Sequence, residues 1–216
     1  MLPLMEFMKS LGKGSYGSVD LIRFTKLDGS NPYYHAVNSS YAQDFDSLHK
    51  EFQILSKLRD CPRIVRTFGT SLSRGVDDYG IRVYKLSMVY AAAESLFSFM
   101  ERTLSESMIR DFTIMILEGL VSVHNLGYVH CDLKPENILV FPHYEYEKDD
   151  LGGVILKLKS SYELKISDFD MSTKLERFHS LFLGTQGVST NVFRKESEGE
   201  RKCFGAVEAS VSAESC

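Results

Sequence analysis

The stretch HCDLKPENILV, from His130 to Val140, decides how the rest of the chain is interpreted. It places an aspartate, a lysine and an asparagine close together, at Asp132, Lys134 and Asn137. A carboxylate can accept a proton, an ammonium group can neutralise a negative charge, and an amide can bind a ligand. An accidental polar turn between a helix and a strand is the alternative. It would leave these groups beside a buried segment without partners, which is energetically costly.

A glycine-rich stretch near the N-terminus, LGKGSYGSVDL, has Gly12, Gly14 and Gly17 in the spacing GxGxxG. Glycines at this spacing let backbone amides approach a phosphate group, because side chains there would block it. A plain hairpin is the alternative interpretation. A strand-like segment beginning at Val19 follows, whereas a dinucleotide-binding turn would open a helix.

The hydrophobic pattern changes along the chain from strand-like to helical. Strands are expected at residues 19–24, 33–37, 64–68, 82–89, 138–140 and 164–166. Apolar residues at spacings of three and four predict one helix between Asp44, its expected N-cap, and Pro62. They predict a second, long helix from Ser105 to Asn125, which Gly127 ends. After Gln186 the pattern disappears, so residues 187–216 are expected to be a disordered tail.

Composition narrows the class of protein. The chain has 216 residues, of which 44% are hydrophobic and 25% charged, and its net charge is -4. This charge gives no general attraction to nucleic acid or acidic membranes. No apolar run approaches the roughly 18 residues of a membrane span. Its four cysteines form no CxxC pair, so a reducing, cytoplasmic or possible nuclear location is expected.

The stretch YVHCDLKPENILV, followed by LKISDFD, resembles the catalytic loop and metal-binding motif of eukaryotic protein kinases of the serine/threonine type. The resemblance runs from about Met8 to Gln186 and is strongest to plant mitogen-activated protein kinase kinase kinases. It implies a two-lobed α+β fold. A strand-rich N-lobe would occupy residues 1–90 and a partial helical C-lobe residues 91–186, since the family's later C-lobe helices are not recognisable.

The resemblance also implies a reaction, the transfer of a phosphoryl group from ATP to a protein hydroxyl with Mg²⁺ as cofactor. Asp132 would orient the substrate hydroxyl, and Lys134 would neutralise the migrating group. Asn137 and Asp168 would hold the metal. The residues expected to contact ATP are Gly12, Lys13, Gly14, Gly17, Val19, Ala36, Asn38, Glu51, Met88, Val89, Tyr90, Ala91 and Leu139. For the apolar members of this set, plain core packing is equally open.

The sequence departs from the family pattern at the strand that precedes the first helix. Asn38 stands where the family has a lysine that pairs with the nucleotide phosphates and with the helix glutamate, here Glu51. An amide donates hydrogen bonds but supplies no charge. Lys13 in the glycine-rich stretch could substitute in principle, although a lysine there more often points to solvent.

The metal-binding motif departs as well. Asp170 stands where the family has glycine, and its carboxylate could either add a metal ligand or repel the nucleotide. Cys131 replaces the arginine that many kinases carry next to the catalytic aspartate. Without that arginine, a phosphorylated activation loop loses its usual binding site, so control by loop phosphorylation is not expected.

Two further departures concern the C-lobe. The link between Asn137 and Asp168 is unusually long, and its run VILKLK suggests an exposed hairpin. The apolar face between Met108 and Val123 would lack the helices that normally cover it, which predicts a protein partner. These departures leave two main alternatives open: an active kinase, or a catalytically impaired pseudokinase or fragment that binds nucleotide or a partner. A third reading is a truncated gene product.

Overall fold

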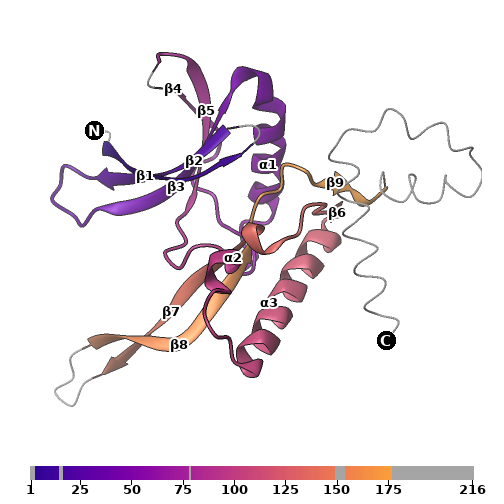
Figure 1. The fold of residues 1–216 in the computed structure, drawn as a ribbon. Coiled ribbons are helices and arrows are strands. Elements are labelled where there is room, and N and C mark those ends of the chain that lie inside the picture. The colour runs from indigo at the N-terminus through magenta and orange to yellow at the C-terminus, as the bar shows by residue number, and fades with distance from the viewer. Residues whose placement is uncertain (1–2, 15–16, 78, 149–153, 177–216) are drawn as a thin grey trace, which may run out of the picture.

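The computed structural model describes residues 3–14, 17–77, 79–148 and 154–176. Its first part is strand-rich and its second part combines a long helix with a long hairpin (Figure 1). The strands are β1 (Leu4–Gly14), β2 (Gly17–Thr25), β3 (Tyr33–Tyr41), β4 (Ser73–Val76), β5 (Arg82–Val89), β6 (Tyr128–Val129), β7 (Ile138–Lys148), β8 (Val154–Ile166) and β9 (Thr173–Lys174). The helices are α1 (Phe45–Lys57), α2 (Leu96–Phe99) and α3 (Glu106–Asn125), with short 3-10 helices η1 (Ala42–Asp44) and η2 (Pro135–Asn137). The tail expected at residues 187–216 lies outside the described residues.

The N-terminal sheet has the strand order β1-β2-β3-β5-β4, and all of its pairings are antiparallel. This confirms the strands expected at residues 19–24, 33–37 and 82–89. The strand expected at 64–68 is wrong. That segment crosses from β8 to β5 and forms only an isolated bridge with each, Ile64 with Ile166 and Thr67 with Met88.

Helix α1 packs on this sheet through the apolar residues that recur at three and four. Leu48, Ile54 and Leu55 are buried there in one core with Leu86 of β5. The expected N-cap, Asp44, sits at the N-cap position but its side chain accepts no hydrogen bond from the helix. It already belongs to the 3-10 turn η1, so the chain enters α1 from a helical turn and the extended cap geometry does not form.

Helix α3 begins and ends where the sequence predicts. The Ser105 hydroxyl accepts a hydrogen bond from the Met108 N–H at 3.3 Å, which satisfies one of the free N–H groups of the first turn. Beyond the last turn, Gly127 adopts φ +74°, a left-handed conformation that glycine reaches without steric cost. Within the part of the chain that the structure describes, no helix is long and apolar enough to cross a membrane.

The long link between Asn137 and Asp168 is an antiparallel hairpin of β7 and β8, as the run VILKLK suggested. The pairing runs from Ile138 opposite Ile166 out to Lys148 opposite Val154, with an irregularity between Pro142 and Tyr144. Figure 1 shows α3 beside this hairpin. Ile138, Val140 and Leu164 of the hairpin form a second core with helices α2 and α3.

Gly119 sets how closely α3 approaches the end of β8. A Cβ added at Gly119 would lie 2.7 Å from Ile166 Cδ1 and 3.3 Å from Arg63 Cβ. Next to it, the Arg63 guanidinium donates a hydrogen bond to the Glu118 carboxylate at 2.8 Å. The helix is therefore close-packed against the strand that leads to Asp168.

We expect Gly119→Ala to lower the free energy of unfolding by about 1–3 kcal/mol, because the added methyl group overpacks this contact. Urea unfolding followed by circular dichroism measures the change. Gly12→Ala is the control, since a Cβ there meets nothing within 4 Å. Equal stability of the two variants would show that α3 and β8 can move apart without cost.

Candidate active site

The loop before β7 brings the three polar residues of HCDLKPENILV into direct contact. Lys134 Nζ donates to Asp132 Oδ2 at 2.6 Å, and Asn137 Nδ2 donates to the same oxygen at 3.1 Å. Asn137 Nδ2 also donates to the Asp132 carbonyl at 2.9 Å, which closes the loop. The hydrogen bond to Asp132 raises the pKa of Lys134, so its ammonium group stays charged. Each of these groups has a partner, so the cost of unpaired groups expected of an accidental turn does not arise here.

His130 stabilises this loop through hydrogen bonds. It is buried, its Nδ1 accepts from the Asp132 N–H at 3.3 Å, and its Nε2 lies 3.0 Å from the Ser167 carbonyl oxygen. Since Nδ1 accepts, Nε2 carries the proton and donates. Burial lowers the pKa of His130, which favours this neutral form. Its ring packs edge-on against the Phe169 ring, with 4.7 Å between the ring centres. His130 therefore contacts both the catalytic loop and the metal-binding motif.

Asn137 and Asp168, the two expected metal ligands, are tied together through Ser167. The Ser167 N–H donates to the Asn137 carbonyl at 2.9 Å, and the Ser167 hydroxyl donates to the same oxygen at 3.0 Å. Asp168 itself has φ +66°, and Cys131 has φ +67°. Non-glycine residues rarely adopt this conformation, and such outliers concentrate at functional sites.

The glycine-rich hairpin of β1 and β2 forms one edge of the N-terminal sheet. Gly12, Val19 and Asn38 are cross-strand neighbours on β1, β2 and β3, so they share a face. A Cβ added at Gly12 meets open space, whereas one at Gly17 would lie 1.9 Å from the Ser39 carbonyl oxygen. Of these two glycines, Gly17 therefore requires glycine for packing, whereas Gly12 does not. Gly14 closes the β1–β2 pairing opposite Gly17.

Asn38 and Glu51 meet as the sequence predicts. Asn38 Nδ2 donates to Glu51 Oε2 at 3.2 Å, and Glu51 is only 2% exposed. Burial, together with the nearby charges of Asp168 and Asp170, raises the pKa of Glu51 to about 8. A protonated carboxylic acid beside an amide is a neutral pair, so α1 is joined to β3 without an ionic bond.

Lys13 lies on the wrong face of the sheet to replace the missing lysine. It pairs with Ser18, which pairs with Ser39, and this row alternates with the row that contains Asn38. Successive residues of a strand point to opposite faces, and Lys13 is exposed. The ammonium group therefore points away from Asn38.

Three carboxyl groups, those of Glu51, Asp168 and Asp170, lie near one another at the metal-binding motif. Burial and the adjacent Asp168 carboxylate raise the pKa of Asp170 to about 7, and Asp170 Oδ1 is buried without a hydrogen-bond partner. A divalent cation would relieve the repulsion between these groups, and carboxylate and amide oxygens are the ligands that Mg²⁺ prefers. Asn137 and Asp168 thus fit the metal role that the resemblance implies.

Known proteins with similar sequences are protein kinases. The family model described as "Protein kinase domain" matches residues 5–195. The chain belongs to the protein kinase family. It is 31% identical over 173 residues to Mitogen-activated protein kinase kinase kinase 20 of Arabidopsis thaliana, which covers 74% of this chain and 50% of that protein. Mitogen-activated protein kinase kinase kinase 17 of the same plant is 27% identical over 91% of this chain and 48% of its own length.

Other relatives are serine/threonine kinases from distant organisms. Serine/threonine-protein kinase SBK1 of Danio rerio is 29% identical over 78% of this chain and 38% of that protein. The chain thus spans about half, or less, of the length of these relatives. The expected two-lobed α+β fold and the resemblance to plant kinase kinase kinases are confirmed.

The kinase's expected adenine contacts lie at the edge of the same face. Ala36 pairs with Met88, and both are buried. Leu139 is half-buried, and its backbone bridges to Ser95. The Val89 N–H donates to the Arg66 carbonyl at 3.0 Å, so this N–H is not available to bind adenine. Tyr90 and Ala91 remain as the predicted backbone contacts of this hinge.

Sequence reasoning missed the residues that hold the two kinase motifs together. Ser167 joins Asn137 to the metal-binding motif, and the Ser172 hydroxyl donates to the His130 carbonyl at 3.2 Å. Both serines are buried polar residues flanking Asp168. Their place directly after the apolar residues Ile166 and Met171 was a signal, since a buried serine must find a hydrogen-bond partner.

The raised pKa of Glu51 gives the kinase a specific pH dependence. The folded state holds this proton up to about pH 8, whereas the unfolded state releases it near the ordinary value of 4.5. Stability from this group is therefore lost as pH rises between those values. We expect Glu51→Gln, which mimics the protonated acid, to become more stable than the natural protein by on the order of 3 kcal/mol between pH 5 and pH 8.

Urea unfolding of both proteins across this pH range measures the difference. Glu101→Gln, a change at an exposed carboxylate, is the matched control. Parallel stability curves for Glu51→Gln and the natural protein would mean that Glu51 is ionised in the folded state.

Proposed function

We propose that this chain is an ATP-dependent serine/threonine protein kinase of a signalling pathway. Asp132 supports this proposal most directly. Both Lys134 and Asn137 donate to Asp132 Oδ2, so Oδ1 is the oxygen that can accept a hydrogen bond from a substrate hydroxyl. Lys134 stands beside it, where its charge stabilises negative oxygens on the migrating group.

The chain's residues divide the work of phosphoryl transfer. Asp132 orients the hydroxyl and takes its proton as the new oxygen–phosphorus bond forms and ADP leaves. Gly12 and Val19 cover the nucleotide, and Asn137 and Asp168 would hold Mg²⁺. The metal ion, when bound, neutralises phosphate charge.

A second function, a binding module with impaired catalysis, is favoured by two observations. The first is the neutral Asn38–Glu51 pair, which supplies no cation to the phosphates. The second is a stripe of exposed apolar side chains on α3, formed by Ile114 (49% exposed), Leu117 (56%) and Val121 (57%). Exposed apolar stripes of this kind mark interaction surfaces, so we propose a protein partner here. A cytoplasmic or nuclear location suits either function.

We expect Asp132→Asn to reduce phosphoryl transfer to a protein substrate by about 10²–10⁴-fold, because the amide cannot accept the proton. Transfer of radiolabelled phosphate from Mg²⁺–ATP to a basic test protein measures this. Asp111→Asn, at an exposed position of α3, is the matched control and should keep full activity. If the natural protein shows no more transfer than Asp132→Asn, the binding module replaces the kinase proposal.

We expect Asn38→Lys to raise kcat/KM by roughly a hundredfold, because it restores a cation between Glu51 and the phosphates. Steady-state kinetics with ATP as the varied substrate gives the value. Ser39→Lys adds the same charge on the opposite face of β3 and should change little. An equal gain in both variants would contradict the placement of Asn38 beside the phosphates.

A further inference from the structure

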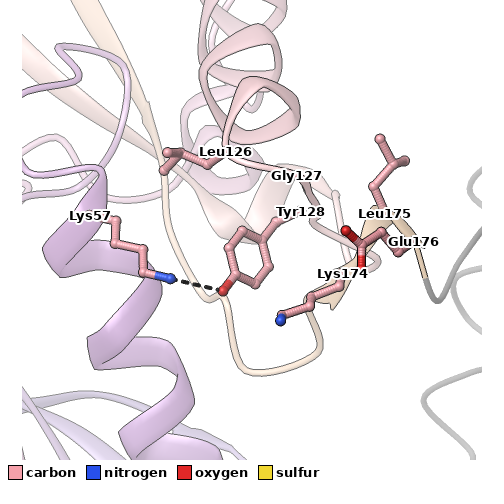
Figure 2. A pocket seen from close by; sticks show the side chains of 7 residues that line it. All are labelled: Lys57, Leu126, Gly127, Tyr128, Lys174, Leu175 and Glu176. Carbon is pink, nitrogen blue, oxygen red and sulfur yellow. Dashed lines mark hydrogen bonds between the residues drawn. The ribbon is translucent and has the colours of Figure 1, made fainter.

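A cavity of about 400 Å³ lies away from the nucleotide site, where the end of α1 meets the turn after α3 and the small β6–β9 sheet. Its polar lining consists of Lys57 from α1, Tyr128 from β6, and Lys174 and Glu176 at and after β9 (Figure 2). Leucines at the turn and after β9 complete the wall. The volume falls in the range of small-ligand sites.

Two lysines and one phenol hydroxyl line this cavity. Lys57 Nζ donates to Tyr128 Oη at 3.2 Å and lies 5.3 Å from the centre of its ring. Lys174 is the cross-strand partner of Tyr128, so both side chains leave the same face of the sheet. Figure 2 shows the two lysines on either side of the tyrosine.

The charges of this group are not balanced. Among the residues that the structure describes, no carboxylate lies within ion-pair distance of Lys57 or Lys174. Glu176 lines the same cavity but forms no such pair. Two like charges that line one cavity repel each other, and an anion bound in the cavity would remove that repulsion.

We propose that this cavity binds a phosphate group. The ammonium groups of Lys57 and Lys174 and the hydroxyl of Tyr128 are the hydrogen-bond donors of the lining, and a phosphate has several acceptor oxygens and the charge to match two cations. The group can belong to a phosphorylated side chain of a protein or to free phosphate. The Glu176 carboxylate opposes binding by like-charge repulsion.

Occupation of the cavity would connect two elements of the active site. Lys57 ends the helix that carries Glu51, and Lys174 lies on the strand that follows Asp168 and Asp170. A phosphate held by both lysines therefore fixes α1 against β9. The inference requires neither nucleotide nor catalysis, so it stands apart from the proposed function.

Titration calorimetry with inorganic phosphate tests the inference, against chloride at equal ionic strength and at a temperature where circular dichroism shows each variant folded. We expect saturable binding to the natural protein and a loss of affinity of about tenfold or more in Lys57→Met and in Lys174→Met, since each removes a charge-assisted hydrogen bond. Lys26→Met, at an exposed loop lysine, is the matched control and should bind normally. Glu176→Gln should bind more tightly.

Binding that is equal in all variants would overturn the inference, because it would be non-specific. Absence of binding would also overturn it and would leave the lysines as counter-charges for the nearby helix ends. A phosphoserine peptide separates the two sources of phosphate. Tighter binding of the peptide than of inorganic phosphate, again lost in Lys57→Met, assigns the site to a phosphorylated protein, and equal binding assigns it to free phosphate.

Discussion

The pairing between the start of β7 and the end of β8 is the constraint on which the active site depends. Ile138 lies opposite Ile166, and this register places Asn137 and Ser167 side by side, where Ser167 donates two hydrogen bonds to the Asn137 carbonyl. Asp168 follows at once. A slip of one residue would turn every side chain of β8 to the other face and separate the two expected metal ligands. The buried isoleucines prevent that slip, since one face of each strand must remain in the core.

The local parts of this site could be predicted from the sequence, whereas its long-range supports could not. The Asp132–Lys134–Asn137 contacts span six residues, so the motif itself fixes them. The contact of Asn38 with Glu51 followed from the family resemblance, whereas the raised pKa of Glu51 did not. The segment from Ile64 to Phe68 was mistaken for a strand because its apolar residues suit one equally well, and only tertiary structure shows that it bridges two sheets. The hydrogen bonds of Ser167 and Ser172 were missed because their partners, Asn137 and His130, lie 30 and 42 residues away in the sequence.

The Asn38–Glu51 pair separates two roles that one lysine combines in most kinases. A lysine at this position both joins β3 to α1 and presents a cation to the nucleotide. Asn38 keeps the first role, because its amide donates to a buried Glu51 that needs a partner. It gives up the second. The position of α1 is therefore not a sign of catalytic competence in this chain, and a bound partner could hold the same helix with no phosphoryl transfer.

Without that lysine, the site has more carboxyl groups than cationic side chains to balance them. Glu51 avoids repulsion by holding its proton, which leaves Asp168 and Asp170 as neighbouring carboxyls, and burial together with their mutual repulsion raises the pKa of Asp170. A nucleotide adds further negative charge to this region. Only Lys134 among the expected catalytic residues is cationic and in place, since Lys13 points to the other face of the sheet. A divalent cation held by Asn137 and Asp168 would relieve the repulsion between these carboxyls, and for the proposed kinase it would also have to neutralise phosphate charge that the missing lysine no longer offsets.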